Sequence, residues 1–333
     1  MRRIVACTAV ALALAAAPAA LADGPFGYAV QSATGVLSLD GTQRYVAVGA
    51  GQTATTTLEA ISTRDGSVVG SVNLIGDWGT PYVVSPNDGA GLSPDGRTLV
   101  LADVPVSFPH TRSAFMFLDP RTLRMRDAVG LKGDYAFDAL SPDGQRLYLI
   151  QHVDQNDQSR YVVRAFDVRT QALLPGRVAD RTQKSWVMQG YPVSRVTSPG
   201  GRWVYTLYDN PGGFPFVHAL DTVRGIAHCV GLPWVGSEGG VYNMRLALRD
   251  GGRTLAVGFA SGRRWMLVDA RTWRIAPDRG GLRWWPLAAG AGGLVVVLAG
   301  LALLLRRRLR QRRLDDEWAR VLAGEGREAA PVA

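Results

Sequence analysis

The fold is decided by a repeat that reads LSPDGRTLVLAD at residues 92–103 and LSPDGQRLYLIQ at residues 140–151. Looser copies of the same pattern occupy residues 37–49, 197–209 and 248–260. Each copy places an Asp-Gly or Gly-Gly pair between two apolar stretches. Asp-Gly supplies the positive φ angles that a tight hairpin needs, so each copy predicts two antiparallel strands joined by a short turn.

A second hairpin pattern alternates with the first. An apolar strand ends in Asp or Ser, a short polar turn follows, and the chain returns as a strand, as in MFLDPRTLRMRDAV at residues 116–129. Its other copies occupy residues 58–72, 164–178, 218–230 and 266–277. Two hairpins that recur about every 50 residues make a four-stranded unit, the blade of a β-propeller. We therefore expect residues 23–283 to form an all-β propeller of five four-stranded blades.

The copies at 92–103 and 140–151, with the FLDPRT and AFDVRT turns that follow them, resemble propellers of the YVTN type and of the related TolB-type and WD-repeat families. The resemblance implies a propeller fold for the repeat region. The repeats are longer than is usual in the YVTN type, so its blade number is not carried over. Its chemistry is not carried over either, because propellers serve as binding modules, scaffolds and enzymes alike. We expect the ring to close by pairing the segment around Tyr28 with the last blade.

Residues 1–22 fit a cleavable secretory signal. Arg2 and Arg3 precede an apolar run, and Ala20-Leu21-Ala22 offers the small residues of a cleavage site. With the signal removed, Cys229 is the one cysteine that remains, so no disulfide within the chain is expected.

A second apolar segment, residues 286–305, carries no charge and has the length that spans a bilayer as a helix, about 30 Å. Trp284 and Trp285 precede it, and the arginine cluster RRRLRQRR at 306–313 follows it. Tryptophans favour the membrane interface and arginines the cytoplasmic side. We predict a transmembrane helix at 284–305, a cytoplasmic basic tail at 306–333, and a propeller held outside the cell membrane of a bacterium.

The net charge of +9, from 37 Lys plus Arg against 28 Asp plus Glu, does not predict a nucleic-acid partner. Much of the excess lies in the two terminal segments, which leaves an ordinary surface between them. Within the tail, residues 306–322 combine the arginine cluster with one apolar helical face. Such a segment could rest on anionic lipid, dock a cytoplasmic partner, or remain solvated.

Aromatic residues recur in the loops that enter successive blades. Large aromatics there fit two readings: wedges between neighbouring blades, or an aromatic rim that binds a glycan, a peptide or a partner protein. The residues are Trp78, Tyr82, Tyr135, Trp186, Tyr191, Trp234 and Tyr242.

Three charged residues, Asp138, Arg195 and Arg245, fall on predicted innermost strands, where apolar residues are the rule. They are a solvated channel lining, a mutual ion pair, or part of a ligand site at the pore mouth. No motif for a cofactor, a metal or a catalytic nucleophile is found, so none is assigned.

The sequence favours a binding or scaffolding ectodomain for an envelope component or a partner protein. The alternative is a propeller enzyme, a carbohydrate-active hydrolase or a lactonase-like enzyme, with its site at the pore mouth. Such an enzyme needs at least two acids close together, and Asp138 is the one acid that we assign to an inner strand. The identity of the ligand is not encoded in any motif.

Overall fold

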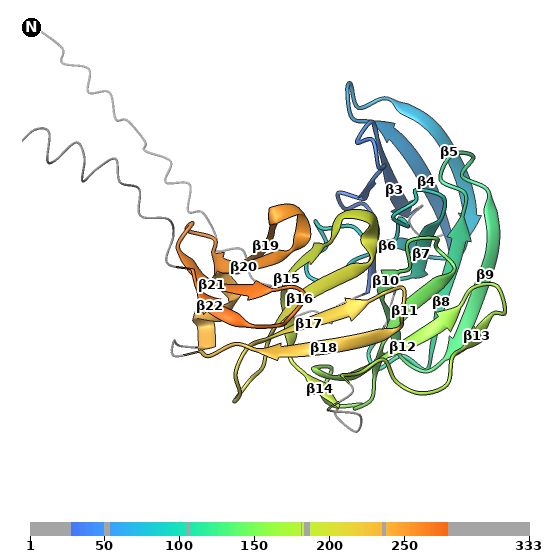
Figure 1. Cartoon of the computed structure of the whole chain (residues 1–333). Helices are drawn as coiled ribbons and strands as arrows, with labels where there is room; N and C mark the ends of the chain where they lie inside the picture. Colours follow the sequence, from blue (N-terminus) through green and yellow to red (C-terminus); the bar gives the residue numbers. More distant parts are fainter. Residues whose placement is uncertain are drawn as a thin grey trace, which may run out of the picture. The chain divides into compact units, whose positions relative to one another are not determined.

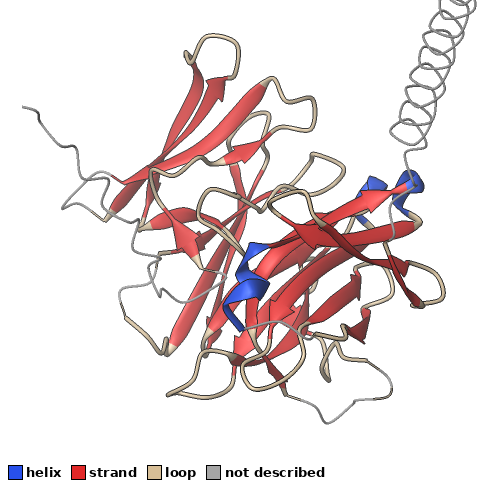
Figure 2. Cartoon of the chain, turned by 90° about the vertical axis from the view of Figure 1, so that its left-hand side faces the viewer, coloured by secondary structure: helices blue, strands red, loops and turns tan. Residues whose placement is uncertain are grey.

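The computed structural model of the protein describes residues 28–49, 54–104, 107–180, 182, 187–234 and 238–278. Strands and loops make up nearly all of this part of the chain (Figure 2). Short 3-10 segments occur at η1 (Pro199–Gly201), η2 (Glu238–Asn243) and η3 (Asp250–Gly252). The described strands form five antiparallel sheets of four or five strands, which confirms the all-β, propeller-like fold that the repeats predict.

The sheets follow one another along the chain, from blue to orange in Figure 1, and we name them blades I to V. Blade I contains β2 (Val36–Leu37), β3 (Gln43–Gly49), β4 (Thr55–Ser62) and β5 (Val68–Ile75). Blade II contains β6 (Trp78–Pro81), β7 (Leu99–Asp103), β8 (Arg112–Leu118) and β9 (Met125–Lys132), with β1 (Ala29–Val30) beside β6. Blade III contains β10 (Tyr135–Leu140), β11 (Arg146–His152), β12 (Arg160–Asp167) and β13 (Ala172–Leu173), with β14 (Met188–Gln189) beside β12.

Blade IV contains β15 (Tyr191–Thr197), β16 (Trp203–Asp209), β17 (Phe216–Asp221) and β18 (Ile226–Gly231). Blade V contains β19 (Met244–Arg249), β20 (Thr254–Phe259), β21 (Arg264–Asp269) and β22 (Ile275–Pro277). Apart from β1 and β14, the strands of every blade pair in the order of the sequence, as consecutive hairpins require.

The Ser-Pro-Asp-Gly turns are held by their own side chains. In blade III the Ser141 hydroxyl donates to Asp143 Oδ1 at 2.6 Å and accepts the N–H of Arg146 at 2.9 Å. The same hydroxyl-to-carboxylate bond joins Ser93 to Asp95 in blade II. These bonds satisfy polar groups inside the turn, so the turn aspartates are explained by local geometry.

The two hairpin turns of a blade lie side by side and share a backbone hydrogen bond. The N–H of Thr63 donates to the carbonyl of Thr42 in blade I, and the N–H of Val168 donates to Gln145 in blade III. Blades IV and V repeat this bond. In blade II the donor position is occupied by Pro120, which has no N–H. Both sets of turns thus lie at one end of the blades, the turn rim. The opposite end is the loop rim.

The expectation of four strands in every blade is wrong for blades II and III. In blade III the outer strand β13 is short, because Pro175 and Gly176 interrupt it, and it pairs with one end of β12 alone. The other end of β12 pairs with β14, where Met188 lies opposite Tyr161. A short strand therefore leaves backbone groups that a later segment satisfies.

The expected closure is also wrong. The segment around Tyr28 does not pair with the last blade. Instead β1 joins β6 of blade II, with Ala29 opposite Pro81 and Val30 opposite Thr80, and the N–H of Tyr82 extends the ladder to the carbonyl of Tyr28. The short inner strand β6 has a free edge, and β1 covers it.

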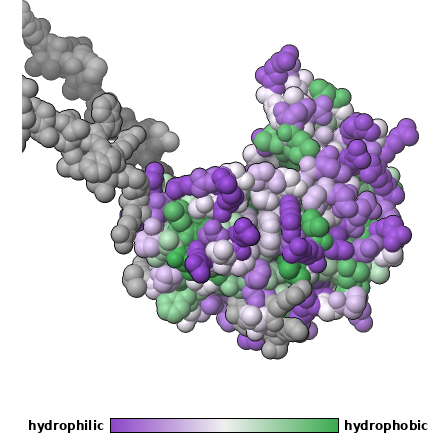
Figure 3. Space-filling model, viewed as in Figure 1, coloured by the Kyte–Doolittle hydropathy of each residue, from purple (hydrophilic) through white to green (hydrophobic). Residues whose placement is uncertain are grey.

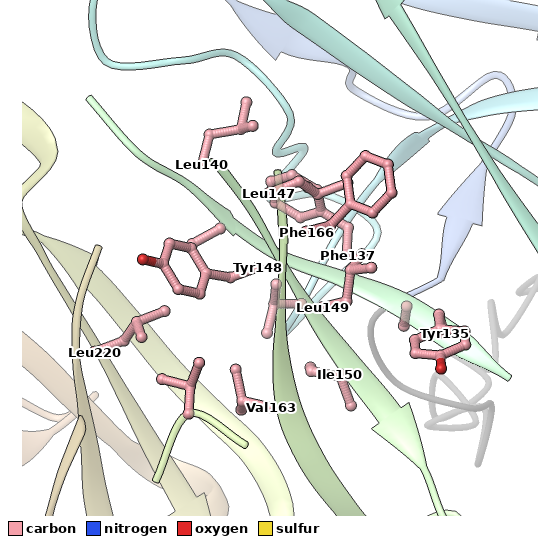
Figure 4. Packing of buried hydrophobic residues seen from close by; sticks show 14 of the residues in the cluster. Tyr135, Phe137, Leu140, Leu147, Tyr148, Leu149, Ile150, Val163, Phe166 and Leu220 are labelled. Carbon is pink, nitrogen blue, oxygen red and sulfur yellow. The ribbon is translucent and has the colours of Figure 1, made fainter. Parts of the chain in front are cut away.

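The largest part of the core lies in blade III and its neighbours. Figure 4 shows Phe137, Tyr148, Leu149, Phe166 and Leu220 packed together from three strands of blade III and one of blade IV. Tyr148 is fully buried, and its hydroxyl donates to the carbonyl of Thr222 in blade IV at 2.8 Å. Burial of each such ring or leucine contributes about 2 kcal/mol, so this cluster fixes blade IV against blade III.

The predicted signal (1–22), transmembrane helix (284–305) and tail (306–333) lie outside the described residues. Within the residues that are described, no helix is long and apolar enough to cross a membrane. All five blades belong to one compact unit that ends at Asp278.

Candidate functional site

A pocket of about 650 Å³ lies among the inner strands of blades I to IV, next to the turn rim. Its walls are largely apolar and include Leu37, Leu39, Val83, Phe137, Leu140 and Val196. Leu37 and Leu39 are 45% and 63% exposed, which is unusual for residues that line an interior space. A pocket of this size that four blades line in common is the principal candidate for a binding site in the described chain.

Two of the charged residues that the sequence singles out meet in this pocket. The side chains of Asp138 on β10 and Arg195 on β15 form an ion pair, with Nη1 to Oδ1 at 2.9 Å. A second bond runs from Nη2 of Arg195 to the backbone carbonyl of Asp138 at 2.5 Å, and Nη1 also donates to Thr206 at 2.8 Å. The carboxylate is 4% exposed and the guanidinium side chain 17% exposed, so the arginine is the partner that faces the pocket.

The backbone explains why Asp138 faces its partner. The pairing of β10 with β11 shifts register between Phe137 and Ala139, so Asp138 is the extra residue of a β-bulge. A bulge turns one side chain out of the normal alternation of a strand. The same irregularity occurs in β15 between Pro192 and Ser194, just before Arg195.

A buried polar row continues from the ion pair across blade IV. Thr206, which accepts from Arg195, lies opposite His218, and His218 lies opposite Cys229. Burial lowers the pKa of His218 to about 4, and burial together with the carboxylate of Asp180 raises the pKa of Cys229 to about 12. Both groups are therefore neutral near pH 7.

Blade II contributes an extra loop to the pocket. Its first strand is interrupted by residues 82–91, whose ends are joined where the N–H of Ala90 donates to the carbonyl of Pro81. Within this loop the backbone of Asn87 accepts a hydrogen bond from Thr34 of blade I, and Asp88 is exposed in the pocket lining. The loop thus joins two blades and narrows the space between them.

The turns of blades II and IV approach each other at the pocket. Gly201 has φ +76°, and a Cβ at that position would lie 2.1 Å from Cγ of Pro94. A side chain at Gly201 is excluded by both the backbone angle and this contact. Gly201 stands at the position of the usual Gly of the repeat, and the departure of the fourth copy is Gly200 in place of Asp, where φ is +74° and glycine is again favoured.

None of the described loop aromatics lines the pocket. Tyr135 is 6% exposed and its N–H donates to Ser113 of blade II. Trp78 is half-buried, and its backbone N–H donates to Thr56 of blade I. Both lie where two blades meet, which favours the wedge interpretation for them.

The remaining aromatics have different surroundings. Trp234 is half-buried against Phe259 and Trp265 of blade V, with ring centroids 6.3 Å and 5.4 Å away. Tyr82 and Tyr191 are also half-buried, whereas Tyr242 is 46% exposed. Trp186 lies outside the described residues. The described aromatics therefore do not form one common exposed row.

Arg245 is separate from the pocket. It is exposed on β19, and its Nη1 donates to the backbone carbonyls of Tyr242 and Met244. The structure thus joins Asp138 with Arg195 and leaves Arg245 outside the pair.

A second polar cluster lies near the loop rim between blades II and III. The Tyr28 hydroxyl donates to Asp134 at 3.0 Å, and Nδ1 of His152 lies 3.2 Å from the same carboxylate. Burial alone would raise the pKa of Asp134, but the hydrogen bond and charge of His152 and the N–H of His110 outweigh it and lower that pKa. The cluster ties β1 to blade III.

Elsewhere on the described surface the exposed apolar side chains are scattered. Figure 3 shows a largely hydrophilic face with separate apolar patches. Isolated apolar residues such as Ile75 and Phe214 are common on folded proteins and indicate no site. Nor do the described residues contain a group of three or more His, Cys, Asp or Glu side chains placed to hold a metal ion.

The chemistry of the pocket follows from its charges. Its described lining contains the carboxylates of Asp88 and Asp138 and the guanidinium groups of Arg44 and Arg195. The Asp138 carboxylate is already paired with Arg195. The arrangement is suited to recognition by an arginine between apolar walls.

The ion pair of Asp138 and Arg195 was one of the alternatives that the sequence left open, whereas most of the apolar lining had no signal in the sequence. Arg44, Leu37 and Leu39 lie in a weak copy of the repeat and carry no distinguishing motif. The loop at 82–91 did have a signal. Both blades begin this stretch with Gly-Asp and an aromatic residue and end it with Leu-Ser, but the stretch is much longer in blade II (76–93) than in blade III (133–141).

No protein-family model and no curated protein sequence matches this chain. Among solved structures, it is similar to the hydrazine synthase of Kuenenia stuttgartiensis, with 15% identity, a TM-score of 0.46, and coverage of 71% of this chain and 70% of that chain. It is also similar to the Dos1 propeller (11%, TM-score 0.41, coverage 74% and 57%) and to a putative TolB from Agrobacterium tumefaciens (19%, TM-score 0.39, coverage 72% and 78%). These likenesses concern the fold alone, and we take no function from them.

Proposed function

We propose that this chain is an exported, membrane-anchored binding module that holds a ligand or a segment of a partner protein in the central pocket. The observation that carries the proposal is the pocket itself, which four blades line and which contains a charged pair among apolar residues. Function on repeat scaffolds is concentrated where several repeats converge. The secretory signal and the apolar segment at 286–305 support an ectodomain outside the cell membrane.

The pocket is tested by photo-crosslinking in cells that express the full-length chain. Benzoylphenylalanine replaces Thr197, an exposed residue of the pocket lining on β15, and in a matched control it replaces Ala247, an exposed inner-strand residue of blade V outside the lining. We expect an adduct that forms at Thr197 and not at Ala247. Equal adducts at both positions, or none at Thr197, would contradict the proposal.

The location is tested separately by fractionation. We expect the full-length chain to remain in membranes after carbonate washing and to begin near Asp23. Release by carbonate would overturn the anchor, and an intact Met1 on the membrane form would overturn the cleaved signal. Neither result depends on the crosslinking experiment, so the pocket and the location can fail independently.

A further inference from the structure

The guanidinium of Arg195 is only partly used by the protein. Nη1 donates to Asp138 Oδ1 and to Thr206, and Nη2 donates to the backbone carbonyl of Asp138. Arginine has five N–H bonds. Among the described residues, the Nε–H and the second Nη2 hydrogen have no acceptor. Nε itself is not buried. Two donors therefore remain available on a residue that lines the pocket.

These two donors lie on the same edge of the group. Asp138 is bound by both Nη atoms, so it meets the end of the guanidinium, and the remaining edge is the one formed by Nε and Nη2. The N–H bonds of that edge are parallel and match the two oxygens of a carboxylate. Because Asp138 and Thr206 already fix the orientation of Arg195, little rotational freedom is lost when a ligand binds.

The surroundings define the rest of the ligand. Leu37 and Leu39 are exposed in the pocket lining, and Val196, the chain neighbour of Arg195, belongs to the same lining. A cationic ligand is disfavoured at this point, because the Asp138 carboxylate is 4% exposed and already paired. The site thus combines an apolar surface with one oriented pair of N–H donors.

We propose that Arg195 binds a carboxylate on a ligand that has an apolar body, through the Nε and Nη2 edge. This inference rests on the proposed function of the pocket as a ligand site. Two sources share this chemistry, the C-terminus of a peptide and a free organic acid. The experiment separates them.

Binding is measured by calorimetry on the full-length chain in detergent micelles, with titrations into protein-free micelles as blanks. The probes are N-acetyl-leucyl-phenylalanine and hexanoate, each paired with its primary amide. We expect at least one acid to bind about tenfold to a hundredfold more tightly than its amide, as a charge-assisted bidentate contact implies. Preference in the dipeptide pair alone indicates a peptide C-terminus, and preference in the hexanoate pair alone indicates a free acid.

The variant Arg195→Lys keeps the positive charge and loses the planar edge, so we expect it to abolish most of the acid preference. Arg245→Lys is the matched control on the inner strand of blade V and should leave the preference unchanged. Removal of Arg195 alone could unfold the chain by leaving Asp138 unpaired, so the double variant Asp138→Asn, Arg195→Gln provides a neutral pair. It too should bind acid and amide equally.

Equal binding of acid and amide to the wild type, or a preference that survives in both Arg195 variants, would overturn the inference. Absence of binding by both acids would overturn it as well. The variant Thr197→Trp distinguishes this failure from failure of the pocket. If acid and amide bind equally and Thr197→Trp blocks both, the pocket binds ligands without reading a carboxylate.

Discussion

Asp138 and Arg195 occupy equivalent positions in neighbouring blades, each three residues before the serine of the first turn, and their side chains meet at 2.9 Å. The repeat thus places opposite charges next to each other by placing them at the same point of successive units. An ion pair takes the place of the apolar contact that these positions would otherwise make. The pair links blade III to blade IV at the wall of the pocket.

Removal of one partner of this pair should destabilise the chain more than removal of both. Arg195→Gln leaves the buried carboxylate of Asp138 without its cation, and we expect a loss of about 3 kcal/mol in the free energy of unfolding. The double variant Asp138→Asn, Arg195→Gln should lose less. Urea denaturation of the wild type, both single variants and the double variant gives the coupling energy. Additive losses would show that the two side chains do not stabilise each other.

His218 should make stability depend on pH in a defined window. Its pKa is about 4 in the folded chain against an ordinary 6.5, so between these values the unfolded chain binds the additional proton. The free energy of unfolding should therefore fall as the pH is lowered from 6.5 to 4, by up to about 3 kcal/mol. His218→Asn should flatten that slope. An unchanged slope in the variant would assign the effect to other groups.

Cys229 should be unreactive while the chain is folded. Its thiol lies 3.6 Å from Nδ1 of the neutral His218, and its pKa of about 12 leaves little thiolate at pH 8. We expect iodoacetamide to modify the native thiol at least about a hundredfold more slowly than the thiol in urea. Mass spectrometry over time gives both rates. Rapid native labelling would mean that this part of blade IV is open to solvent.

The loop aromatics should differ in their contribution to stability. Trp234 packs on Trp265 and Phe259, so Trp234→Ala should cost about 2 kcal/mol, less than for a fully buried tryptophan. Tyr242 is exposed, and Tyr242→Ala should change the free energy of unfolding by no more than about 0.5 kcal/mol. The shift of each variant's thermal midpoint from that of the wild type measures the difference. Equal shifts would contradict a contribution to stability from the packing of Trp234 on Phe259 and Trp265.

The fold was predictable because its signals are local. A turn such as Ser141 to Gly144 specifies a hairpin by itself, and five such turns with their partners specify five sheets. The pairing of β1 with β6 was not predictable, since Ala29 and Val30 carry no pattern that distinguishes one exposed edge from another. The extra strand β14 was easier to anticipate. Pro175 and Gly176 interrupt the outer strand β13, so part of β12 needs another partner.

Residues of the candidate site could be predicted where a charged side chain falls on a strand that is otherwise apolar. Asp138 and Arg195 stood out on strands that are otherwise apolar, and the structure pairs them. Loop aromatics gave a less specific signal, because a ring at a blade junction and a ring on a binding rim have the same spacing in the sequence. Which one a residue is depends on the packing of the adjacent blade, as the buried Tyr135 and the exposed Tyr242 show.

The pairing of β1 with β6 makes blade I an insertion within blade II. Val30 lies opposite Thr80, and the side chain of Gln31 donates to the carbonyl of Trp78, so the two ends of the intervening sheet meet at one point. A whole blade could therefore be deleted or exchanged between these ends by a short splice, with the ladder of β1, β6 and β7 left in register. During synthesis from the N-terminus, β1 has no partner until blade I and β6 have been made, so the first described strand is among the later ones to pair.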